Sequence, residues 1–374
     1  MSNSCRTAPR IALLAALLGA ISLAWSFETA AAQAPKPKKV KAAKDSTDTL
    51  PKKFKPSKLF KSEAPFEMTL TGNFKKLRRE KSGTTVWHPV TVAYADSAGK
   101  PVEIPLRART RGIWRLKNCD FPPLRLNFTS KTTKGTQFDD LDEPKLVSFC
   151  RSGGNGEQWL LQEYQLYRIY ALLTPISHQT RLLRVTYMDS ATAKPEFTRL
   201  AFMVDDPRRM GERLGGRIFA RKGAGPDDVD PAQAATMFLF QYMIGNTDFS
   251  VSGLHNAELV QMPNGEISPV AYDFDFSGAV NATYATSDPS LRIKTVRQRQ
   301  FRGYCAIKTQ YPAAIALFQA KKNEIYALYS DAIGALMDKG VVRETLEYFD
   351  DFYKDVKTQK DFERNLFGDC TQAS

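Results

Sequence analysis

Strand-like segments fill the first half of the chain, and helical patterns dominate the second half. The strand-like segments are rich in β-branched and aromatic residues, and turn residues separate them. They cover residues 66–70, 84–95, 102–110, 124–128, 145–150, 182–188 and 199–204. One long helix, 157–173, interrupts them, with Leu160, Tyr164, Tyr167 and Ala171 on one stripe. This order of elements predicts an α+β fold.

The second half contains several helices and one hairpin. Asp206 is placed to cap a short helix that starts at Pro207, and Asp230 to cap a helix over 231–244. Gly245 is placed to end that second helix. A hairpin is predicted from strands 257–261 and 267–273, and two further helices cover 313–339 and 342–354.

The N-terminus has the pattern of a signal peptide. Arg6 and Arg10 precede an apolar run over residues 11–25, and three alanines stand before Gln33. The apolar run is shorter than the ~20 residues that span a bilayer. We therefore expect residues 1–32 to be removed, and the mature protein to be periplasmic or secreted with no transmembrane segment. An uncleaved anchor is the alternative.

The positive charge is concentrated in residues 33–62. The whole chain carries a net charge of +13, and this segment holds ten Lys against two Asp, which leaves only +4 from Glu63 onward. The segment is predicted to be a disordered Lys/Pro-rich linker, because it has few apolar residues. It is either a solvated spacer or a contact for an anionic envelope surface. The body lacks an aromatic-interleaved basic stripe, so a nucleic-acid partner is not expected.

Four cysteines remain after removal of the signal peptide, an even number that suits an oxidising compartment. We expect disulfides Cys119–Cys150 and Cys305–Cys370. A zinc site with help from His88, His178 or His255 is the alternative, although no Cys-x-x-Cys spacing supports it.

Polar residues that suit phosphoryl transfer gather in two neighbouring stretches. Asp248 and Asn256 lie in the loop after helix 231–244, and Asp273 and Asp275 follow the hairpin. Such chemistry needs one carboxylate at the acceptor hydroxyl, and an amide oxygen and a second carboxylate to hold Mg²⁺ against the phosphates. The short hairpin would bring these groups into one cleft.

These stretches resemble the catalytic half of the bacterial spore-coat kinase family (CotH-type); toxin kinases of the HipA type are more distant. The pair Arg111-Gly112 and the basic strand over 122–126 are similar to the family as well. The resemblance implies a two-lobed protein-kinase-like fold. In that fold a β-rich N-lobe with one long helix (63–206) precedes a mainly helical C-lobe with the catalytic-type loop (207–374).

The resemblance also implies residue roles. Asp248 would be the catalytic residue, and Asn256 with Asp273 or Asp275 would bind Mg²⁺. ATP would be held by Arg125, paired with Glu163 on the long helix, with Arg111 as the substitute. The chain departs from the kinase pattern in three ways. Asp248 and Asn256 are eight residues apart, whereas protein kinases and the HipA type place theirs five apart; no kinase-type Gly-rich loop is present, and the nucleotide-binding base is not a clear Lys.

The sequence therefore predicts Mg²⁺-dependent phosphoryl transfer from a nucleotide to a hydroxyl group of a protein or small molecule. The alternative is a catalytically inactive, pseudokinase-like binding or envelope-structural module. Two other chemistries are weaker: a Cys150 nucleophile with His178 or His255, and a glycosidase pair formed by Asp273 and Asp275.

Overall fold

The computed structural model describes residues 54–81 and 86–372. The predicted signal peptide (1–32) and the predicted linker up to residue 53 lie outside the described residues, so both stay predictions. Among the residues that the structure describes, no helix is both long and apolar enough to cross a membrane.

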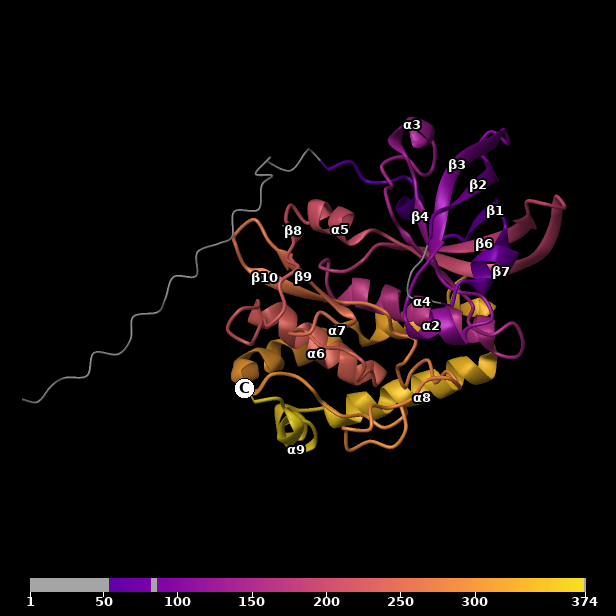
Figure 1. Ribbon diagram of the computed structural model, residues 1–374. Coiled ribbons are helices and arrows are strands. Elements are labelled where there is room, and N and C mark those ends of the chain that lie inside the picture. The colour runs from indigo at the N-terminus through magenta and orange to yellow at the C-terminus, as the bar shows by residue number, and fades with distance from the viewer. Residues whose placement is uncertain (1–53, 82–85, 373–374) are drawn as a thin grey trace, which may run out of the picture. The chain divides into compact units, whose positions relative to one another are not determined.

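Seven strands of the first half form a closed barrel (Figure 1). They are β1 (Phe66–Gly72), β2 (His88–Ala95), β3 (Pro101–Thr110), β4 (Leu124–Asn127), β5 (Lys145–Ser148), β6 (Thr180–Asp189) and β7 (Lys194–Val204). Their order round the barrel is β1-β2-β3-β4-β5-β7-β6. All neighbours are antiparallel except β1 and β6, whose parallel pairing closes the barrel.

The barrel interior is filled by alternate apolar side chains. Along β2, Val90, Val92 and Tyr94 are buried, while the residues between them are more exposed. This period of two is what a strand with one buried face requires. Leu70 and Ile104, from β1 and β3, are fully buried in the same cluster.

The remaining elements lie outside the barrel. They include a second sheet with strand order β10-β9-β8 and a set of helices. The strands are β8 (Arg217–Ile218), β9 (Ala257–Gln261) and β10 (Ile267–Ala271). The α-helices are α1 (Phe74–Arg79), α2 (Trp114–Asn118), α3 (Ser130–Thr133), α4 (Gly156–Leu173), α5 (Pro207–Arg213), α6 (Pro231–Ile244), α7 (Tyr311–Ala327), α8 (Lys339–Asp355) and α9 (Gln359–Asn365). Short 3-10 helices cover Leu59–Lys61, Cys305–Gln310, Gly334–Leu336 and Phe367–Asp369.

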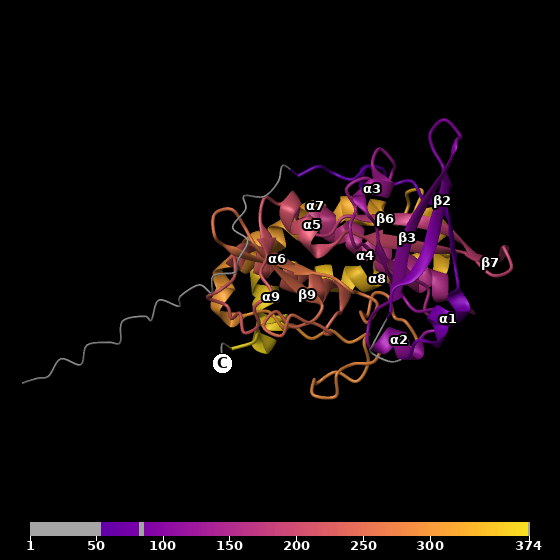
Figure 2. The same ribbon diagram turned by 45° about the horizontal axis from the view of Figure 1, so that its top comes forward.

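Helix α4 lies between the barrel and the helices of the second half (Figures 1 and 2). It packs on β6 and β7 on one side and on α6 and α7 on the other. For this reason it is buried on nearly all sides, and not along the single predicted stripe; Ala171 of that stripe is exposed.

The predicted ends of α6 are confirmed. The Asp230 side chain accepts hydrogen bonds from the backbone N–H groups of Ala232 and Gln233, and Pro231 opens the helix. Gly245 ends it with a left-handed backbone, φ 65°, a conformation that glycine adopts at little cost.

The predicted helix over 313–339 is too long. Helix α7 ends at Ala327, and the Asp331 side chain then accepts hydrogen bonds from the backbone of Ile333 and Gly334. These side-chain hydrogen bonds stabilise a turn after α7 that competes with continued helix, which the apolar pattern alone did not reveal.

The prediction of a two-lobed protein-kinase-like fold is wrong. The strands expected to make a kinase N-lobe close into a seven-stranded barrel, and a separate three-stranded sheet stands beside it. Closure depends on pairing β1 with β6, more than a hundred residues apart in the chain. The alternation within each strand predicts a buried face but does not say which strands pair.

Both predicted disulfides are present, Cys119–Cys150 and Cys305–Cys370. The first joins the residue after α2 to a residue just after β5, and the second ties the C-terminal segment to the start of a 3-10 helix. Because all four sulfurs are bonded in pairs, they do not form a zinc site, and Cys150 is not a free nucleophile.

The last part of the predicted linker packs on the body. Leu59 is fully buried, and the Arg209 guanidinium lies 4.8 Å from the centre of the Phe54 ring. Lys55 Nζ lies 3.0 Å from an Asp139 carboxylate oxygen. The apolar anchors Phe54 and Leu59 therefore hold this part of the chain in place.

Candidate functional site

A cavity of about 950 Å³ lies between the barrel and the second sheet. The barrel side contributes the segment from Arg111 to Arg115, together with residues of β4 and β5. The opposite side is formed by the loop between α6 and β9 and by residues that follow β10. Asp248, Asn256, Asp273, Asp275, Arg111 and Arg125, all singled out from the sequence, line this one cavity.

A small turn in the α6–β9 loop brings Asp248 and Asn256 together. The backbones of Ser250 and His255 form an antiparallel bridge, which folds the loop back on itself. Asn256 Nδ2 then donates hydrogen bonds to the Asp248 carboxylate (3.0 Å) and to its carbonyl oxygen (2.7 Å). The eight-residue spacing is thus compatible with direct contact.

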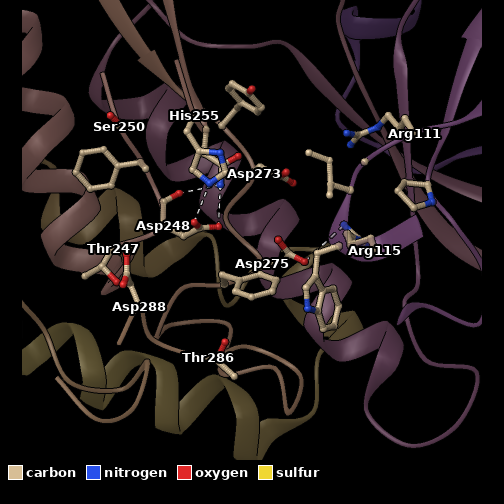
Figure 3. Close-up of a pocket in the computed structure, with 18 of the residues that line it drawn as sticks. Arg111, Arg115, Thr247, Asp248, Ser250, His255, Asp273, Asp275, Thr286 and Asp288 are labelled. Atoms are coloured by element: carbon tan, nitrogen blue, oxygen red, sulfur yellow. Dashed lines mark hydrogen bonds and ion pairs between the residues drawn. The ribbon is translucent and has the colours of Figure 1, made fainter. Parts of the chain in front are cut away.

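His255 is a second partner of Asp248. Its Nε2 lies 2.8 Å from Asp248 Oδ1, so both carboxylate oxygens of Asp248 are engaged (Figure 3). The Asp248 backbone N–H donates to Asn246 Oδ1, which orients the residue at the start of the loop. Sequence reasoning considered His255 only as a zinc ligand or the partner of a cysteine.

Three carboxylates lie close together at the cavity: Asp273 and Asp275 line it, whereas Glu163 is buried and is not among the lining residues. One oxygen from each of Glu163, Asp273 and Asp275 lies within 4.8 Å of the others. The predicted strand 267–273 ends at Ala271, so both aspartates lie beyond β10 rather than on it. The Asp273 N–H donates to the Tyr167 hydroxyl on α4 (2.9 Å), and Asp275 accepts from Tyr284 (3.1 Å).

Arg115 is the cation that pairs with this cluster. Its guanidinium lies 3.6 Å from Glu163 and 3.8 Å from Asp275, and it donates to the Ser148 carbonyl at 2.6 Å. The expected Arg125–Glu163 pair does not form: Arg125 lies 3.4 Å from Glu143 and 3.9 Å from Asp206. Sequence reasoning missed Arg115 because α2, the short helix that carries it, was not predicted.

Arg111 reaches the cavity from the segment after β3 (Figure 3). Its Nε is buried and has no hydrogen-bond partner among the described residues. Arg115 Nε and Nη1 also lack a hydrogen-bond partner among the described residues, but the Arg115 guanidinium is paired with the Glu163 and Asp275 carboxylates.

The electrostatics of the cluster favour the uptake of positive charge. Burial raises the pKa of Glu163 well above its ordinary value, and the Asp275 carboxylate raises it further. Burial also raises the pKa of Asp275 to about 6, because Arg115 offsets only part of the cost of a buried carboxylate. A proton or a cation would relieve this repulsion.

The three carboxylates are close enough together to be candidate ligands of a divalent cation. Carboxylate oxygens are the ligands that Mg²⁺ prefers, and two oxygens bound to one such ion lie roughly 3–4 Å apart. The observed separations are within 4.8 Å, and Glu163 Oε1 is buried without a hydrogen-bond partner among the described residues. Asp273, Asp275 and Glu163 are thus the groups that could hold a metal, and Asn256 lines the same cavity as the two aspartates.

No protein-family model matches the chain, and no curated protein matches it either.

Proposed function

We propose that this cleft binds a nucleotide such as ATP together with Mg²⁺, and transfers a phosphoryl group to a hydroxyl of a protein or small molecule. The observation that carries the proposal is that Asp248, Asn256, Asp273 and Asp275 all line one cavity. The residues come from two loops on either side of a hairpin. The similarity of those loops to the spore-coat kinase family also supports the proposal, although the barrel differs from a kinase fold.

In this proposal the residues have separate tasks. Asp248 orients the acceptor hydroxyl and accepts its proton, while Arg111 faces the phosphates of the donor. Arg115 holds Glu163 and Asp275 in place. When bound at Asp273 and Asp275, Mg²⁺ would neutralise phosphate charge.

A binding module without turnover is the second candidate. The observation that favours it is that His255 and Asn256 occupy both carboxylate oxygens of Asp248. An acceptor hydroxyl would have to displace one of these contacts. This candidate predicts nucleotide binding without formation of product.

We further propose that the mature protein is periplasmic or secreted. The signal-peptide pattern supports this, as do two disulfides, which persist in oxidising compartments. N-terminal sequencing of the exported protein should begin near Gln33, and full-length protein confined to the cytoplasm would contradict export.

Asp273→Asn tests the metal site. We expect calorimetry with ATP and Mg²⁺ to show affinity lowered by at least about tenfold, because loss of even an outer partner of a metal typically costs about 10–100-fold. Asp189→Asn is a control at the half-buried last residue of β6, outside the cavity. Equal affinities of wild type and a folded Asp273→Asn variant would rule out this metal site.

A further inference from the structure

Four ionisable side chains form a connected chain where the barrel meets the second sheet. Lys145 Nζ, on β5, lies 3.3 Å from Glu258 Oε1 on β9. The other Glu258 oxygen lies 3.0 Å from His178 Nε2, and His178 Nδ1 lies 2.6 Å from Asp205 Oδ1. Lys145, His178 and Asp205 are buried, and the Glu258 side chain is only 14% exposed.

The charges of these four side chains balance. Both ring nitrogens of His178 face carboxylates, which is the arrangement of a protonated ring that donates on both sides. Burial opposes that charge, but Glu258 and Asp205 outweigh burial and raise the pKa of His178 to about 9. Two cations thus alternate with two anions. Burying four such groups adds little to stability compared with apolar packing, which points to a role other than stability for these side chains.

One end of this row of four ionised side chains reaches the candidate cleft. Lys145 and Glu258 both line the 950 Å³ cavity. The Lys145 ammonium lies 3.9 Å from the centre of the Tyr272 ring, which also lines it. An ammonium group has three N–H donors. The Glu258 contact engages one of them, which leaves donors for a ligand in the cavity.

We propose that Lys145 binds the phosphate groups of the cleft's ligand, and that His178 is a positioning residue that acts through Glu258. This inference deepens the proposed function and rests on it for the nucleotide as ligand. The chemistry recognised is that of a polyphosphate anion. His178 and Asp205 fix the Glu258 carboxylate, and Glu258 in turn holds the Lys145 ammonium at the cavity wall.

The test measures binding of inorganic pyrophosphate without metal, and of ATP with Mg²⁺, by calorimetry. Lys145→Met should weaken both by about ten- to a hundredfold, as expected for loss of a charge-assisted hydrogen bond. Arg168→Met is the matched control, because Arg168 is also a buried cation with two carboxylate partners but lies outside this cavity. It should leave both affinities within about twofold of wild type.

Two further variants control for loss of folding and test whether His178 acts through Lys145. Lys145→Met with Glu258→Gln also removes the Glu258 carboxylate, which the single change leaves paired with His178 but not with Lys145, so it addresses a failure to fold. His178→Gln should weaken pyrophosphate binding when Lys145 is present but have no effect in the Lys145→Met background. A purely structural role for His178 would give the same loss in both backgrounds.

The outcomes separate this inference from the proposed function. Pyrophosphate binding that needs Lys145, without any Mg²⁺-dependent nucleotide binding, would support the inference and defeat the proposed function. Nucleotide binding that needs Asp273 but not Lys145 would do the reverse. Equal losses in Lys145→Met and Arg168→Met, or no binding of either anion by wild type, would overturn the inference.

Discussion

Two residues of the site adopt an uncommon backbone conformation. Asn256 has φ 48° and Asp273 has φ 62°, both in the left-handed region. Asparagine and aspartate enter this region more readily than most residues, but the conformation persists only where surrounding contacts hold it. The Tyr167 hydroxyl accepts the Asp273 N–H, and Asp248 accepts from the Asn256 side chain. These contacts stabilise the backbone conformation that sets the direction of each of the two side chains.

The buried His178 should make stability depend on pH. Its pKa is raised from 6.5 to about 9 in the folded protein, so its contribution is fully present below pH 6.5 and is lost as pH rises through about 9. We expect the free energy of unfolding, measured with urea, to fall across this window in wild type. His178→Gln should remove that part of the slope. An unchanged slope in the variant would contradict the assignment of a protonated His178.

At the scale of elements, changes in the segment 54–62 should affect stability, whereas deletion of the predicted disordered segment before it should not. Leu59 is fully buried in the barrel cluster, so Leu59→Ala should cost roughly 2–5 kcal/mol of unfolding free energy. Deletion of residues 33–53 should leave the melting temperature nearly unchanged, because that segment has few apolar residues. A large loss of stability after this deletion would contradict the predicted linker.

Local signals predicted some elements well and missed others. Asp230, Pro231 and Gly245 identified α6, because capping depends on neighbours in the chain. The barrel was missed because its closure depends on pairing between distant strands. The carboxylates were found from their loops, whereas the basic partner of Glu163 was assigned to Arg125 instead of Arg115. Which arginine pairs with Glu163 depends on the path of the polypeptide around α2, which local sequence signals did not predict.

At the scale of the whole molecule, the candidate cleft lies where three parts of the chain meet. The barrel and the segment between β3 and β4 supply most of the cations, and the loops around the β9–β10 hairpin supply Asn256 and the carboxylates of the lining. Glu163 of α4 lies beside Asp273 and Asp275. The Cys119–Cys150 disulfide links the end of α2 to the end of β5, so it joins the elements that carry Arg115 and Lys145. The residues of the cleft, and not the fold, therefore indicate the function.

The central claim is tested most directly by ATP turnover with Mg²⁺ in wild type and in Asp248→Asn. We expect wild type to form ADP, and Asp248→Asn to retain ATP affinity while turnover falls by about 10²-fold or more, the typical contribution of a positioned general base. ATP binding by both proteins without ADP formation would leave only the binding module. No Mg²⁺-dependent ATP binding by well-folded wild type would contradict the account.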